Sequence, residues 1–287
     1  MSEKIHFLNT GYSDCIILES NGLIAMIDAA EDSDIPENKP YLKYPGYEDV
    51  VVNYLLSHFA DENGKVRIEF VLGTHAHSDH LGGFDTVINH PDIEVKTAYL
   101  KPYDSKQVFI YERLIWDNEE VYRQMLNAIK ENGVELIESF DNTQTILGNI
   151  SIKFYNGEYR KHFFKYGENV NSVVTLAEVY GKRFVFAGDL NYKCGDEKRL
   201  AKEIGKVDVL KVGHHGYFYS TSFYWAKKLS PEYAIVCNSN RRIYPDVKWK
   251  LKNISHSIII ATADVNGVIV EVDKNSGISI KPNSMEN

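Results

Sequence analysis

Three histidines and an aspartate fall within six consecutive positions of the stretch 73–84, GTHAHSDHLGGF. They follow VRIEFVLG (66–73), which is rich in β-branched residues and predicts a buried strand. We therefore expect the four side chains on a loop at the carboxyl end of this strand, where α/β folds usually bind ligands. The alternative is a polar helix start with Asp79 as its cap. Such a density of imidazole and carboxylate groups favours a metal site, with Zn²⁺ the expected ion and Fe or Mn as alternatives.

The spacing within this stretch predicts two ions. His75 and His77 are two positions apart, so their side chains can point the same way and bind one ion. Asp79 and His80 lie beyond the turn and are expected to reach a second ion.

Two other predicted strands end in residues of the same kind. FVFAGDL (184–190) places Asp189 after a glycine, and VLKVGHHG (209–216) ends in His214 and His215. By itself, Asp189 would be interpreted as an ordinary turn aspartate, and a lone histidine as structural. Because all these groups follow strands, a layered sheet structure can bring them to one edge.

The remaining segments alternate between strand-like and helix-like patterns. Strands are predicted within 4–29, 66–75, 94–101, 134–156, 171–190, 207–216, 233–238 and 267–281. Helices are predicted within 49–59, 84–90, 105–131, 196–204 and 221–229. Two halves of similar rhythm predict an α/β fold with two mixed β-sheets packed face to face and helices outside. No linker-like stretch is present, so we expect a single domain over residues 1–287.

The overall charge and hydropathy restrict the partners. The formal net charge is −8 and no basic face stands out, which argues against nucleic acid as a partner without excluding it. There is neither an apolar run of about 18 residues nor a signal-peptide pattern. We therefore expect no membrane span and a cytoplasmic location, although a trimmed secreted protein would look the same. The three cysteines lack metal-site spacing and are interpreted as core or incidental thiols.

These motifs resemble those of the metallo-β-lactamase superfamily, whose HxHxDH signature stands at 75–80, and the resemblance covers nearly the whole chain. It implies a four-layer αββα fold. It also implies six ligands for two divalent ions: His75, His77, Asp79, His80, Asp189 and His214. Asp189 would bridge the ions, and Asp28 would support the metal loop from behind.

One position departs from the family pattern. Many members carry another histidine between the HxHxDH motif and the bridging aspartate. The matching region here is ENVNSVVTL (168–176), which holds Asn171, while His162 precedes a different local pattern. Asparagine is a weak metal ligand, so we expect either a looser first ion or a water or substrate oxygen in that place. Asn171 is thus a candidate substrate-binding residue.

Within the superfamily, NSVVTL, AGDL and DVLKVGHHG are similar to two branches. One is the metallo-β-lactamase domain of DNA-uptake channel proteins, and the other is the catalytic module of teichoic acid phosphorylcholine esterase. AYLKPYDS (98–105) and YERLIWDN (111–118) lie outside the metal motifs and are similar to the second branch.

The resemblance leads to the hypothesis of a two-metal phosphodiesterase acting on a small-molecule or cell-wall phosphodiester. A hydroxide between the ions would attack phosphorus, Asp79 would orient it, and His215 would contact the phosphate or protonate the leaving oxygen. A choline-bearing substrate needs an aromatic cage, for which Trp116 and Tyr217 are candidates. For each of these two, the alternative is a core or lid position. Competing hypotheses are a metal-dependent nuclease and a non-catalytic metal-binding relic; the oligomeric state is not predicted.

Overall fold

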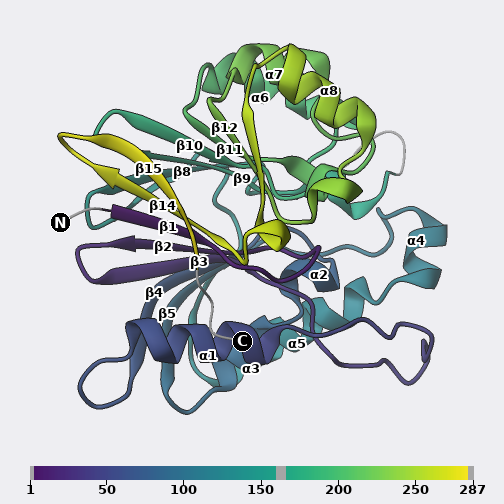
Figure 1. Ribbon diagram of the computed structural model, residues 1–287. Helices are drawn as coiled ribbons and strands as arrows, with labels where there is room; N and C mark the ends of the chain where they lie inside the picture. Colours follow the sequence, from purple (N-terminus) through teal and green to yellow (C-terminus); the bar gives the residue numbers. More distant parts are fainter. Residues whose placement is uncertain (1–2, 160–165, 284–287) are drawn as a thin grey trace.

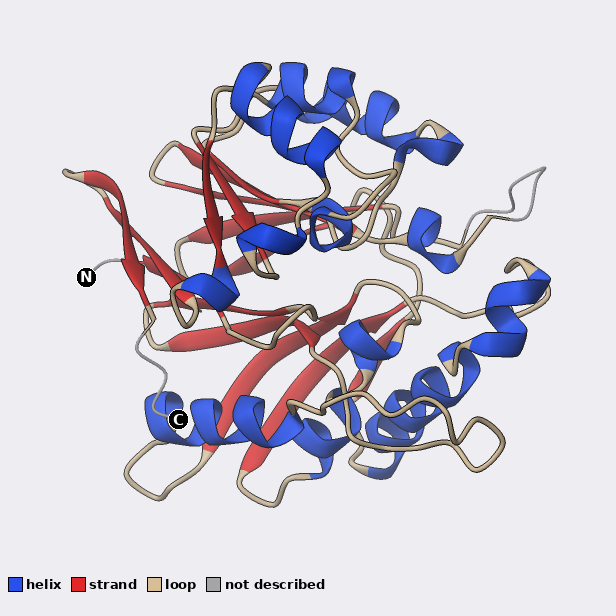
Figure 2. Cartoon of the chain, turned by 45° about the vertical axis from the view of Figure 1, so that its right-hand side comes forward, coloured by secondary structure: helices blue, strands red, loops and turns tan. Residues whose placement is uncertain are grey.

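The computed structural model describes residues 3–159 and 166–283, and His162 lies outside them. Two β-sheets pack face to face, and helices cover the outer side of each sheet (Figure 1). A view with helices and strands in separate colours shows the sheets between the two helical layers (Figure 2). This is the α/β architecture that the sequence predicts.

The first sheet has eight strands in the order β15-β14-β1-β2-β3-β4-β5-β6. It is mixed, because β3 to β6 run parallel whereas the other neighbours are antiparallel. Its strands are β1 (Glu3–Phe7), β2 (Cys15–Ser20), β3 (Leu23–Ala29), β4 (Val66–Gly73), β5 (Ile93–Leu100), β6 (Glu135–Ile137), β14 (Val268–Asp273) and β15 (Gly277–Pro282).

The second sheet has seven strands in the order β13-β12-β11-β10-β9-β8-β7. Here β10 to β13 run parallel, and β7 to β10 are antiparallel neighbours. Its strands are β7 (Gln144–Leu147), β8 (Ile150–Tyr155), β9 (Val174–Val179), β10 (Lys182–Phe186), β11 (Val209–Lys211), β12 (Tyr233–Val236) and β13 (Ile258–Ala261).

The helices form two outer layers. Against the first sheet lie α1 (Glu48–Phe59), α3 (Phe84–Asn89) and α5 (Asn118–Glu131). Against the second lie α6 (Asp196–Ile204), α7 (Phe223–Leu229) and α8 (Pro245–Asn253). The short helices are α2 (Ser78–Leu81), α4 (Ile110–Ile115) and five 3₁₀ turns: η1 (Glu168–Asn171), η2 (Tyr192–Cys194), η3 (Gly213–Gly216), η4 (Asn240–Arg242) and η5 (Thr262–Asp264). Within the described ranges, no helix combines the length and the apolar character that crossing a bilayer requires.

Strand β4 shows how the sequence builds these layers. Successive side chains of a strand point to opposite faces. Phe70 and Leu72 therefore enter the core between the sheets, where the Phe70 ring contacts that of Phe154 edge to face, with ring centroids 6.1 Å apart. Val71 points the other way, into the core that the first sheet shares with its helices. A buried strand with apolar residues on both faces thus follows from a central position in a four-layer fold.

The structure differs from the predicted elements in three places. Asp79 and His80, which were expected on a loop, lie in the short helix α2. The segment 105–131 is not one helix, because the chain is extended at Trp116 between α4 and α5. Helix α8 and strand β13 were not predicted, although Pro245 stands at the first turn of α8, a position that proline favours.

The three ligand-bearing motifs follow β4 of the first sheet and β10 and β11 of the second. The predicted common edge is therefore built from the carboxyl ends of strands in both sheets.

Candidate metal centre

The loop after β4 is held from behind by Asp28. Asp28, the penultimate residue of β3, has a left-handed backbone (φ 59°) and is completely buried. Its carboxylate accepts hydrogen bonds from the Thr74 backbone N–H at 2.9 Å and the Thr74 hydroxyl at 2.8 Å. The same carboxylate lies 2.8 Å from Nδ1 of His80. This arrangement turns Nε2 of His80 toward the site, as a carboxylate behind a metal-binding histidine does.

His75 and His77 point one ring nitrogen each at a common place. Nε2 of His75 lies 3.1 Å from Nδ1 of His77. Their other ring nitrogens have partners, because Nδ1 of His75 lies 3.1 Å from the Thr74 hydroxyl and Nε2 of His77 lies 2.8 Å from Oε1 of Glu112. The two facing nitrogens are thus available for one ion.

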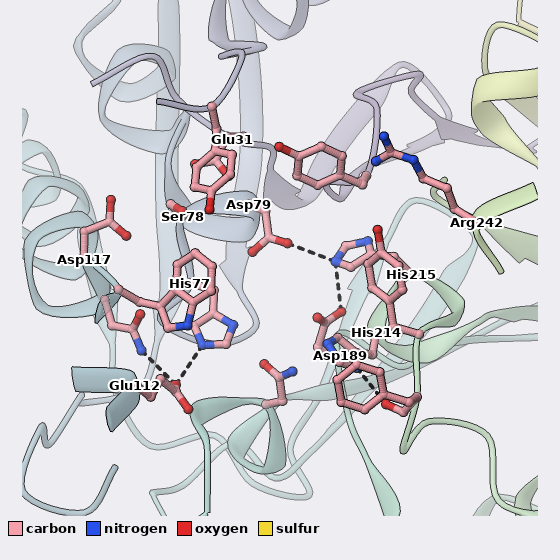
Figure 3. Close-up of a pocket in the computed structure, with 17 residues that line it drawn as sticks. Glu31, His77, Ser78, Asp79, Glu112, Asp117, Asp189, His214, His215 and Arg242 are labelled. Atoms are coloured by element: carbon pink, nitrogen blue, oxygen red, sulfur yellow. Dashed lines mark hydrogen bonds and ion pairs between the residues drawn. The ribbon is translucent and has the colours of Figure 1, made fainter. Parts of the chain in front are cut away.

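A second group consists of Asp79, His80, Asp189 and His215, whose ligand atoms all lie within 4.8 Å of one another. Figure 3 shows Asp79, Asp189 and His215 pointing at each other from three separate segments. Nε2 of His215 lies 3.1 Å from Asp79 Oδ2 and 3.3 Å from Asp189 Oδ1. Nε2 of His80 lies 3.2 Å from the same Asp189 oxygen.

The chemistry of these groups fits divalent cations. Asp189 Oδ1 is buried and has no hydrogen-bond partner, although two imidazole nitrogens lie close to it. Buried carboxylate oxygens without a partner are rare in folded proteins. Imidazole nitrogens and carboxylate oxygens that converge in this way match the ligands of Zn²⁺ and related ions. The His/Asp clusters are therefore consistent with divalent metal ions.

The carboxylates also determine how the buried histidines titrate. Burial by itself lowers the pKa of His80 and His215, but Asp189, together with Asp28 at His80 and Asp14 at His215, raises both pKa values well above the usual range. A metal ion competes with protons for these nitrogens, so its binding releases protons.

The structure places His215, and not His214, in the ligand group. Both residues have left-handed backbones in η3, with φ of 51° and 48°. His215 is turned inward and is 1% exposed, whereas Nδ1 of His214 lies 3.1 Å from the Phe218 carbonyl oxygen at the cavity wall. The sequence-based choice of His214 thus differs from the geometry, because two consecutive left-handed residues send adjacent side chains in different directions.

Sequence reasoning also missed a buried ion pair beneath the ligands. Lys211 binds Asp14 through its ammonium group, which also donates a hydrogen bond of 2.9 Å to the Gly188 carbonyl oxygen. Asp14 Oδ1 lies 3.4 Å from Nδ1 of His215. Burial raises the pKa of Asp14, but the charges of Lys211 and His215 outweigh it and hold this pKa well below its usual range. A lone lysine in the apolar strand VLKVG was the available signal.

A cavity of about 640 Å³ opens above the ligands. Trp116 and Tyr217, both expected to bind substrate, line it, as do His77, Asp79, Asp189 and His215. Figure 3 shows Glu31 and Asp117 on one side of this cavity and Arg242 on the other.

Asn171 does not line the cavity; Asn169 of the same turn does. Asn171 is buried, and its Nδ2 donates to Glu168 Oε2 at 3.0 Å, while its Oδ1 has no hydrogen-bond partner. Of the two asparagines in the tight 3₁₀ turn η1, Asn169 therefore lines the cavity, whereas Asn171, the candidate substrate-binding residue, does not.

Comparison with solved structures identifies the architecture. The metallo-β-lactamase fold protein YhfI from Bacillus subtilis aligns with 94% of this chain and 100% of its own, with a TM-score of 0.56 and 10% identity. The chain has the metallo-β-lactamase fold. Igni18, a metallo hydrolase from Ignicoccus hospitalis, aligns with 95% of the chain and 99% of its own, with a TM-score of 0.52 and 17% identity.

Sequence comparison adds distant relatives of this metallo-β-lactamase-fold chain. ComE operon protein 3 of Bacillus subtilis is 26% identical over 213 residues, which is 74% of the chain and 25% of that protein. Competence protein ComA of Neisseria gonorrhoeae is 23% identical over 210 residues, 72% of the chain and 25% of that protein. The chain thus spans about a quarter of the length of these relatives. No protein-family model matches it. The predicted αββα fold is confirmed. Of the two branches that the sequence resembles, the comparisons support that of the DNA-uptake proteins, through a distant likeness to competence proteins. The likeness to the phosphorylcholine esterase stays a prediction.

Proposed function

We propose that this chain is a metal-dependent phosphodiesterase. The observation that carries the proposal is that both ligand groups contribute to the lining of one cavity, the first group through His77 and the second through Asp79, Asp189 and His215. Two divalent ions held there would supply Lewis-acid stabilisation of phosphoryl oxygens and a nucleophile from water at neutral pH.

The residues of the chain position this centre. Glu112 holds the ring of His77, Asp28 holds that of His80, and Asp14 faces that of His215. Such outer carboxylates fix the tautomer and the direction of each ligand.

In this proposal His214, and not His215, is the histidine that contacts the phosphate or protonates the leaving oxygen. When Nδ1–H of His214 donates to the Phe218 carbonyl oxygen, its Nε2 is left as an acceptor in the cavity wall. This nitrogen can accept a proton from a substrate oxygen, or, once protonated, donate one to it.

One side of the cavity suits a cationic group, as in a phosphorylcholine-type ester. The rings of Tyr44 and Trp116 lie 6.2 Å apart. Glu31 and Asp117 are buried beside them. Burial and the nearby Asp79 raise the pKa of Glu31 to about 9, so we expect a bound cation to favour loss of its proton. Aromatic faces with adjacent carboxylates are the usual environment of quaternary ammonium groups.

The test is metal analysis combined with four substrates: p-nitrophenyl-phosphorylcholine, bis-p-nitrophenyl phosphate, single-stranded DNA and a β-lactam. We expect the metal-loaded protein to cleave the phosphodiesters. Trp116→Ala should raise KM for the choline ester by about tenfold more than KM for bis-p-nitrophenyl phosphate. Trp249→Ala is the matched control, because Trp249 is 54% exposed on α8 and does not line the cavity. If the metal-loaded protein cleaves none of the three phosphodiesters (the two p-nitrophenyl compounds and DNA), the proposed function is refuted.

A second candidate is the metal-dependent nuclease, the hypothesis that the resemblance to the DNA-uptake channel proteins suggests. A strand-binding groove needs several lysines or arginines along the phosphates. Among the described residues that line the cavity, Arg242 is the one arginine and no lysine is present. Cleavage of DNA in preference to the small diesters would decide for the nuclease.

A further inference from the structure

Arg242 occupies an electrostatically distinct side of the cavity. Glu31 and Asp117 lie across the ligand cluster from it, so the cavity has an acidic side and a cationic side (Figure 3). Arg242 belongs to η4, which follows β12 of the second sheet, whereas Asp117 lies between α4 and α5 beside the first sheet.

The segment that carries Arg242 is tied to the loop that carries His215. The backbone N–H of Tyr244 donates to the Gly216 carbonyl oxygen at 2.8 Å, and Nδ2 of Asn238 donates to the His215 carbonyl oxygen at 3.1 Å. These bonds flank Arg242 on both sides in the sequence. The position of its backbone relative to the ligand cluster is therefore determined by the fold.

The guanidinium group of Arg242 has a free edge. Its Cζ lies over the ring of Tyr12, 5.8 Å from the ring centroid, within the range of a cation–π contact. Within residues 3–159 and 166–283, no carboxylate forms an ion pair with this side chain. A guanidinium group carries its N–H donors in one plane, and a cation–π contact leaves these donors available for bidentate binding of a phosphate or carboxylate.

We propose that Arg242 binds a second anionic group of the substrate, on the side of the scissile phosphodiester away from Asp117. Cleavage of that diester rests on the proposed function, whereas the anion site rests on the geometry alone. Arg242 is the one lysine or arginine among the described residues of the lining, so a second anion would be attracted here rather than to the side that carries the carboxyl groups. The substrate class is thus a phosphodiester flanked by another phosphate or a carboxylate, as in a chain of repeating phosphodiesters or a phosphorylated polyol.

Calorimetric binding to the metal-loaded protein tests this site. The probes are propyl phosphate, with one anionic group, and two molecules with a second: 1,3-propanediol bisphosphate and 3-phosphonopropanoate. We expect the bisphosphate to bind the wild-type protein about tenfold more tightly than propyl phosphate. The carboxylate-bearing probe shows which of the two anions Arg242 prefers. In Arg242→Gln the advantage of the second anion should disappear, and Arg242→Lys should restore part of it.

Arg241→Gln is the matched control. It removes the same charge from the neighbouring residue, whose side chain does not line the cavity. Thermal melting checks that each variant is folded. An unchanged advantage in Arg242→Gln, or an equal loss in Arg241→Gln, would overturn the proposal. Hydrolysis of bis-p-nitrophenyl phosphate is followed separately, so a protein that discriminates the anions but cleaves no diester would refute the phosphodiesterase and leave the anion site in place.

Discussion

Glu112→Gln tests whether the carboxylate behind His77 contributes to metal affinity. Oε1 of Glu112 lies 2.8 Å from Nε2 of His77. The same oxygen accepts hydrogen bonds from Asn118 Nδ2 at 3.0 Å and from the Glu168 backbone N–H at 2.9 Å. A glutamine oxygen can keep all three contacts, so the substitution removes the negative charge with little change in shape.

The expected magnitude follows from that one charge. A hydrogen bond to a charged partner stabilises by about 1.5–3 kcal/mol, against about 0.5–1.5 kcal/mol for a neutral one. The loss of about 1–2 kcal/mol corresponds to a metal Kd that rises roughly 5- to 30-fold. Substitutions of such outer carboxylates typically cost about 10- to 100-fold in metal affinity.

Competition with a chromophoric chelator measures this Kd for wild type and variant. Glu119→Gln is the control, because Glu119 is an exposed glutamate in the first turn of α5. A twofold or smaller change in Kd for Glu112→Gln, with the fold intact by circular dichroism, would refute the assignment of Glu112 as the partner of a metal ligand.

Three other measurements address the centre and its surroundings. His215→Ala should lower the metal content by elemental analysis, whereas His214→Ala should keep both ions; the opposite pattern would restore the sequence-based choice. Lys211→Met leaves Asp14 buried without its counter-charge and should lower the free energy of unfolding, measured in urea, by about 3–5 kcal/mol. Adding Asp14→Asn should recover part of this loss. A cost under about 1 kcal/mol would contradict the ion-pair argument. Burial raises the pKa of Glu197 from 4.5 to about 7. The unfolded chain therefore loses this proton first, and stability should fall by about 3 kcal/mol as the pH rises from about 4.5 to about 8. Glu197→Gln should flatten that dependence in urea titrations, and an unchanged slope would exclude Glu197 as its source.

Local patterns were sufficient for much of the fold. The alternation of β4 and the helical spacing of 49–59 correspond to β4 and α1, because period-2 and period-3.6 patterns reflect which face is buried. The extended break at Trp116 was not predicted, since a helical pattern on both sides conceals it. This break places Trp116 in the cavity lining.

The partners behind the ligands were mostly beyond sequence reasoning. Asp28 was expected to support the metal loop, and its bonds to Thr74 and His80 agree with that role. Glu112 lies 35 residues from His77, and Lys211 lies 197 residues from Asp14. Nothing local marks such pairs, because they form only when the two sheets and α4 pack together.

The sequence by itself determined the kind of chemistry, since three strand ends carry imidazole and carboxylate groups that few folds would place together without a metal. Only the tertiary structure decided which of two neighbouring residues of the same type faces the site. The left-handed backbone at His214 and His215 turns the second ring inward, and the turn at 168–171 presents Asn169 instead of Asn171 to the cavity. Residue type sets what a side chain can bind, but its direction depends on backbone dihedral angles that distant packing imposes.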